Sequence, residues 1–220
     1  MPRPISDIAD ILDNECTTLT GGRFGDYFTA NTGRTFDELV LTSDRMRFEP
    51  TDIVAIEMLS VTLHPAGVHK LLLDRHFAAE CSDLLRQIPA DMSLADAGPE
   101  VVGPQSAAQQ LWNLLRGDVP GVHSGGTVLY KLMAAKRPHL FPIWDTRVAR
   151  VVDKTDGQWW EPIRSLLSDH ATCKRITEAT VEAPSHVSLL RRVDVALWRY
   201  GNTLAVHPGE TTDGSVDTVG

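Results

Sequence analysis

The sequence predicts an all-α protein, a single helical domain of about eight to ten short helices, which leaves room for a small β-hairpin near the N-terminus. Along most of the 220 residues, apolar side chains recur at the period of an amphipathic helix. Prolines and glycines separate these apolar segments, as expected where short helices are joined by turns. No linker is long or polar enough to divide the chain, so we expect one domain over 1–202 and a disordered acidic tail over 203–220.

The same period predicts where the individual helices lie. Between 17 and 50 the period is broken by glycines, and short extended pieces such as 36–41 are expected there. The almost uniformly apolar segment 53–61 favours a buried helix over a strand, because Thr51 and Asp52 before it form a helix-start signal. The other helices are expected at 5–16, 65–88 (one or two helices), 107–116, 128–137, 146–152, 159–168, 170–180 and 188–200.

Charge and composition argue against several classes of protein. The net charge of −8 argues against a general nucleic-acid binder, because phosphate binding depends on cationic side chains. Residues 119–154, however, hold six basic and two acidic residues, so this stretch carries +4 and the rest of the chain −12. The three cysteines are far apart and lack the spacing of metal ligands, so they indicate neither a disulfide framework nor a metal site, and no cofactor is expected. No apolar run is long enough for a membrane span and the N-terminal residues do not resemble a secretory signal, so we expect a cytoplasmic protein with no membrane partner.

The most informative stretch, 119–152, begins with a glycine-rich turn. Gly121, Gly125 and Gly126 allow backbone conformations with positive φ and a close approach of a ligand to the main chain. His123 lies between them. The helix that follows offers unpaired amides and the positive end of its dipole, which together favour an anion, and Lys131 on this helix could reach the same anion. The alternative is that the turn only joins two packed helices.

A basic loop and a lone aspartate complete the stretch. Lys136 and Arg137 stand at the end of a helix, where two cations are favourable for the helix dipole alone. Two prolines then stiffen the chain and orient Trp144 and Asp145. Asp145 precedes a helix, so it is expected as an N-cap, as a base or electrostatic stabiliser, or as both. The predicted ligand-binding residues are Gly121, His123, Gly125, Gly126, Lys131, Lys136, Arg137, Trp144 and Arg147.

Two families resemble this stretch. Pro120-Gly121-Val122, with Asp145 following 25 residues after Pro120 in the segment FPIWDTRV, is similar to the helix–hairpin–helix DNA glycosylase superfamily. Residues 121–148 also resemble an uncharacterised, actinobacterial-type family of bacterial proteins with a Gly-containing turn, a "KLLArKRP" helix end and a "PvyD" segment. The glycosylase resemblance implies a helix–hairpin–helix fold in which Gly121 contacts a phosphate. It also implies that Asp145 supports cleavage of a base from its sugar.

The chain departs from the glycosylase pattern at four points. His123 replaces the second hairpin glycine, and a glycine occupies the region of the lysine found in lyases. Asp145 lies two residues later than in the common spacing, and no four-cysteine cluster follows. A bifunctional lyase and an iron–sulfur enzyme are therefore not expected.

These observations predict a glycosylase-like protein that binds a phosphate-bearing ligand, either nucleic acid or nucleotide, between the turn and the Lys136/Arg137 loop. If it is an enzyme, hydrolysis of an N-glycosidic bond is the expected reaction, with Asp145 as the catalytic carboxylate. One alternative is a non-catalytic binding or structural domain, in which Asp145 only caps a helix and Lys136 and Arg137 face solvent. A second alternative is an enzyme that acts on a small metabolite. The sequence lacks the motifs of serine hydrolases, P-loop proteins and dinucleotide-binding folds.

Overall fold

The computed structural model describes residues 10–12, 24–30, 32–122, 126–152 and 160–204. Twelve α-helices lie wholly within this part of the chain, together with two 3-10 turns, and no β-strand is found there. The elements are the 3-10 turn η1 (Phe24–Asp26), α2 (Tyr27–Ala30), α3 (Thr32–Thr42), α4 (Pro50–Glu57), α5 (Pro65–Leu72), α6 (Arg75–Gln87), the 3-10 turn η2 (Leu94–Asp96), α7 (Pro99–Val102), α8 (Ala107–Asp118), α9 (Thr127–Lys136), α10 (Thr146–Val151), α11 (Glu161–Leu167), α12 (His170–Ala179) and α13 (Leu189–Thr203).

The predicted all-α class is confirmed, and the helices from residue 107 onward lie where the apolar period places them. The number of helices is higher than expected because single turns such as α7 are also helical and because 65–88 divides into α5 and α6. Asp74 makes this division, since its side chain accepts hydrogen bonds from the N–H groups of His76 and Phe77 at the start of α6. The described residues do not contain the expected hairpin, and residues 13–23 lie outside them.

Two predictions of secondary structure before residue 65 need correction. The expectation of an extended piece at 36–41 is wrong, because these residues belong to α3. Phe36 and Val40 are four residues apart and both buried, which is the spacing of one helix face. The apolar segment 53–61 is helical only as far as Glu57, and the chain then turns through Ser60, which has a φ of 61°.

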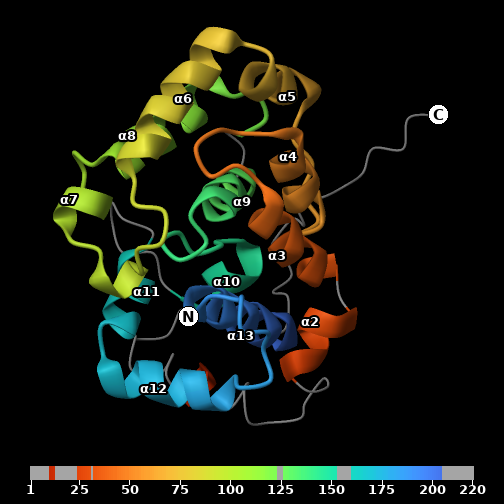
Figure 1. Cartoon of the computed structure of the whole chain (residues 1–220). Helices are drawn as coiled ribbons and strands as arrows, with labels where there is room; N and C mark the ends of the chain where they lie inside the picture. The colour runs from red at the N-terminus through yellow and green to blue at the C-terminus, as the bar shows by residue number, and fades with distance from the viewer. Residues whose placement is uncertain (1–9, 13–23, 31, 123–125, 153–159, 205–220) are drawn as a thin grey trace.

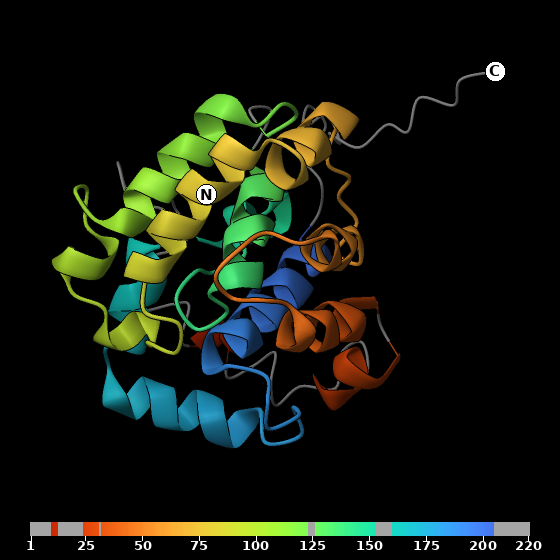
Figure 2. The same ribbon diagram turned by 45° about the horizontal axis from the view of Figure 1, so that its top comes forward.

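Helix α9 lies at the centre of the molecule and positions the candidate site (Figure 1). Every residue from Leu129 to Lys136 is buried, so neighbouring helices cover α9 on all sides. In the view turned by 45°, α9 lies between α8 and α4 (Figure 2), and Figure 1 shows α10 and α13 below α9. Lys131 and Lys136, two of the residues expected to contact a ligand, therefore lie on an enclosed helix.

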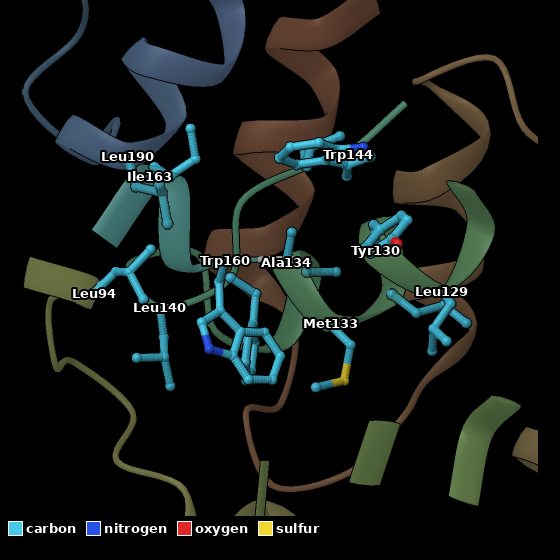
Figure 3. Packing of buried hydrophobic residues seen from close by; sticks show 14 of the residues in the cluster. Leu94, Leu129, Tyr130, Met133, Ala134, Leu140, Trp144, Trp160, Ile163 and Leu190 are labelled. Carbon is cyan, nitrogen blue, oxygen red and sulfur yellow. The ribbon is translucent and has the colours of Figure 1, made fainter. Parts of the chain in front are cut away.

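The hydrophobic core gathers around α9 (Figure 3). Met133 of α9 lies beside Trp160, which precedes α11 and lies next to Leu140, and all three side chains are buried. Burial of each large apolar side chain contributes about 1.5–3 kcal/mol, so this cluster accounts for a substantial part of the folding free energy. None of the helices in the described ranges has both the length and the apolar character that a membrane crossing requires.

Candidate functional site

Asp145 lies at the amino end of α10 and acts as its N-cap. Its backbone is extended, with φ −127° and ψ −179°, and its Oδ1 accepts hydrogen bonds from Arg147 N at 2.9 Å and Val148 N at 3.0 Å. These two bonds satisfy amides that the helix itself leaves unpaired. Neither bond uses Oδ2, and the residue as a whole is 9% exposed. The predicted capping role is thus present in the structure, on a carboxylate of low exposure.

Two contacts from α13 hold the segment that carries Asp145. The Oδ2 atom of Asp194 accepts a hydrogen bond from Ile143 N at 3.1 Å, two residues before Asp145. Gly201 lets α10 approach closely, since a Cβ atom there would lie 2.4 Å from the carbonyl oxygen of Arg147. The position of Asp145 is therefore fixed by α13 as well as by its own helix.

Asp194 is a second carboxyl group near Asp145, and no sequence motif indicates its contact with Ile143. Burial raises the pKa of Asp194 well above its usual range, and the charge of Asp145 adds to this effect while Arg191 opposes it. The neutral acid is therefore favoured at residue 194. Its Oδ1 atom has no hydrogen-bond partner among the residues that the structure describes.

Lys131, which was expected to reach an anion at the glycine-rich turn, lies inside the fold. It is 4% exposed, and its Nζ donates a hydrogen bond to the carbonyl oxygen of Leu59 at 2.7 Å. Desolvation lowers the pKa of Lys131 to about 8, and the charge of Asp145 partly opposes this shift. The structure thus brings the Lys131 amine within electrostatic range of Asp145, between α9 and α10.

The two cations of the basic loop are structural. Lys136 is 1% exposed, and its Nζ lies 2.5 Å from the fully buried Asp52. Arg137 has no exposed surface and donates hydrogen bonds to backbone carbonyls, among them those of Arg45 and Ile88. Both side chains are occupied by partners inside the fold, so neither belongs to the candidate site. The alternative in which they face solvent is also wrong.

The remaining predicted site residues are separated by the fold. Gly121 is exposed in the turn after α8 with a φ of 85°, and Gly126 caps the amino end of α9 with a φ of 73°. Trp144 is buried and packs into the core (Figure 3). Arg147 is exposed and lies over the ring of Trp198, with a distance of 5.5 Å to the ring centroid. His123 and Gly125 lie outside the described residues.

No group of three or more His, Cys, Asp or Glu side chains suited to a metal ion occurs in the part of the chain that the structure describes. The groups that the fold does bring together near α10 are a carboxylate, a neutral acid and a buried amine of lowered pKa, contributed by Asp145, Asp194 and Lys131. Groups of this kind can hold or move a proton. The amino end of α9 is the second feature of interest.

Comparison with known proteins places the chain in one family. Residues 21–201 match the model of the Family of unknown function (DUF6308), so the chain belongs to this family. The predicted membership of an uncharacterised family is confirmed by this match. No curated protein and no solved structure matches the chain.

Proposed function

We propose that this member of the family binds a phosphate-bearing ligand, a nucleotide or nucleic acid, at the amino end of α9, and that Asp145 is the carboxylate that acts on the bound molecule. The observation that carries the proposal is the start of α9. Gly126 opens the helix in the left-handed conformation and supplies no side-chain acceptor for the amides of the first turn. Such amides, together with the helix dipole, attract an anion.

The geometry of the turn before α9 supports a close approach of the ligand. Gly121 is exposed and has a positive φ, and because His64 packs against the position that a side chain would occupy, a phosphate would meet this backbone from the solvent side. Val122 is buried and anchors the turn on the core. The proposed phosphate contact is thus made by main-chain groups on a supported turn.

Hydrolysis of an N-glycosidic bond is the reaction that we propose for a bound nucleotide or nucleic acid. Cleavage of this bond builds up positive charge on the sugar, which a carboxylate such as Asp145 would stabilise, or a carboxylate would activate the attacking water. Asp194 would act as a positioning residue through its bond to Ile143. This reaction class rests on the similarity of 120–148 to the glycosylase superfamily.

Two observations favour the alternative, a non-catalytic domain. The Oδ1 atom of Asp145 is fully used by the cap of α10, and Lys136 and Arg137 are unavailable to a ligand.

The net charge of −8 opposes the binding of a long polyanion, so within our proposal a nucleotide or a short strand is favoured over extended duplex DNA. An enzyme acting on another small metabolite would fit the same charge.

The test compares Asp145→Asn with Asp169→Asn. Asp169 caps α12 through a bond from Thr172 N to its Oδ2 at 2.9 Å, so it provides a matched helix cap outside the proposed site. Asparagine caps helices about as well as aspartate, so both variants are expected to fold. Free base released from nucleotides and from labelled single- and double-stranded oligonucleotides is measured, and binding is measured across a salt series.

We expect binding that weakens with salt, and base release that is lost in Asp145→Asn and retained in Asp169→Asn. Binding without base release by the wild type would favour the non-catalytic domain. If neither nucleotides nor oligonucleotides bind at low salt, the proposal is wrong.

A further inference from the structure

Arg147 in the first turn of α10 is an exposed cation that the fold holds in one orientation. Its guanidinium group lies over the ring of Trp198 on α13, 5.5 Å from the ring centroid, and its Nε donates a hydrogen bond to Asn202 Oδ1. Trp198 is itself supported by Tyr27, whose ring meets it edge to face at a centroid distance of 5.9 Å. Because α10 packs against α13, these contacts order a side chain that ordinarily moves freely in solvent.

The charge of Arg147 has no carboxylate partner among the described residues. The two groups that its guanidinium contacts there, the Trp198 ring and the Asn202 amide, are both neutral. The hydrogen bond to Asn202 uses Nε, so neither Nη atom is bonded to an acceptor within the same ranges. Since the side chain is exposed, both Nη atoms are available to an acceptor from outside the chain.

The chemistry of the guanidinium group indicates which ligand group it binds. Its two Nη atoms can donate in parallel to two oxygens of a phosphate or a carboxylate, and the ligand of the proposed function supplies phosphate. A side chain that is already ordered loses little conformational entropy on binding, which favours this contact over one made by a mobile arginine. The backbone N–H of Arg147 donates to Asp145 Oδ1 at 2.9 Å, so this cation and the proposed catalytic carboxylate share one helix start.

We propose that the ligand of the candidate site is a short single-stranded oligonucleotide, and that Arg147 binds one of its backbone phosphates while another lies at the amino end of α9. The inference rests on the proposed function, which supplies the contact at α9. A nucleoside monophosphate carries one phosphate and can occupy only one of the two contacts, whereas a strand occupies both. Phosphate contacts fix the position of a strand without reading its sequence, so Arg147 sets the position of the strand relative to Asp145.

The test compares thymidine 5′-monophosphate with a 5′-phosphorylated thymidine tetranucleotide, each titrated calorimetrically into the full chain across a salt series. Arg147→Gln removes the guanidinium group. Arg75→Gln is the matched control, because Arg75 lies in the first turn of α6, is exposed and has no ion pair within the described ranges. Both variants remove one cation from the first turn of a helix, so their effects on net charge and on the helix dipole are alike.

We expect the wild type and Arg75→Gln to bind the tetranucleotide more tightly than the monophosphate. In Arg147→Gln, tetranucleotide binding should weaken at least fivefold while monophosphate binding is unchanged, and the slope of log K against log salt should become shallower by about 0.7, the value for one phosphate of a single strand.

The inference would be overturned by tetranucleotide binding that is absent, no tighter than that of the monophosphate, unaffected by Arg147→Gln or equally weakened by Arg75→Gln. An equal loss for both ligands in Arg147→Gln would overturn it as well. If the monophosphate does not bind but tetranucleotide binding still depends on Arg147, the contact at α9 is wrong and the contact at Arg147 stands.

Discussion

The buried ion pair between α9 and α4 gives the sharpest prediction for stability. Lys136 Nζ lies 2.5 Å from Asp52 Oδ2, and it also donates hydrogen bonds to Ser43 Oγ and to the carbonyl oxygen of Asp44, each at 2.8 Å. Desolvation lowers the pKa of Lys136 and raises that of Asp52. Each charge is therefore costly on its own and tolerable only beside the other.

Replacing Lys136 by Met keeps the buried aliphatic chain and leaves the Asp52 carboxylate without its cation. Removal of one partner of a buried pair costs about 3–5 kcal/mol. Asp52 keeps two donors, Ser43 Oγ at 2.7 Å and Glu49 N at 2.7 Å, so we expect a loss of about 3 kcal/mol. Adding Asp52→Asn to Lys136→Met removes the stranded charge, and the double variant should lose less than the sum of the two single losses by at least about 1.5 kcal/mol.

Urea unfolding followed by tryptophan fluorescence measures these free energies. Lys70→Met is the control, because Lys70 forms a partly exposed ion pair with Asp74 at a similar distance, 2.8 Å, and its removal should change stability much less. A loss below about 1 kcal/mol in Lys136→Met, or additive effects in the double variant, would refute the structural role that we assign to this lysine.

Three further predictions concern a buried amine, the glycines and a thiol. Folding lowers the pKa of Lys131 from 10.5 to about 8, so between pH 8 and pH 10.5 the unfolded chain binds more protons than the folded one. The free energy of unfolding of the wild type, relative to that of Lys131→Met, should therefore rise by about 3 kcal/mol over this pH range. A difference that does not change with pH would contradict the burial of this amine. Gly121→Ala should lower the free energy of unfolding in urea by about 2–4 kcal/mol, because φ is 85° and the new Cβ would lie 2.6 Å from His64 Cβ. Gly117→Ala in α8 should raise it by about 0.5–1 kcal/mol, because no atom lies within 4 Å of the new Cβ. Equal effects of the two variants would contradict the described conformation at Gly121. Burial raises the pKa of Cys81 to about 12, so its alkylation at pH 8 should require unfolding, and rapid labelling of this cysteine in the native protein would show that it is accessible.

The sequence was sufficient to predict the fold class and the helices from residue 107 onward, because their apolar period and their capping residues agree. Prediction from the sequence failed where the burial of a side chain depends on residues distant in the chain. Nothing in the local pattern shows that Phe36 packs beneath Arg191, which lies more than 150 positions away in the chain. The extended reading of 36–41 was therefore as reasonable as the helical one.

The same limit applies to the candidate site. The sequence identified Asp145 and its cap, which depend on neighbouring residues. It could not identify the partners of Lys136 and Arg137, since a pair of cations at a helix end looks the same whether it meets solvent or a buried carboxylate. The contact of Asp194 with Ile143 spans 51 positions and has no local signature.

The most direct test of the proposed function places a negative charge where the phosphate is proposed to bind. Thr127 and Ala107 are the first residues of α9 and α8, and a glutamate at either position is favourable for the helix dipole, so both variants should fold. Calorimetric titration with a nucleoside monophosphate at low salt should show binding by the wild type and by Ala107→Glu, and binding at least tenfold weaker in Thr127→Glu. No binding by the wild type, or equal binding by all three proteins, would contradict an anion site at the amino end of α9.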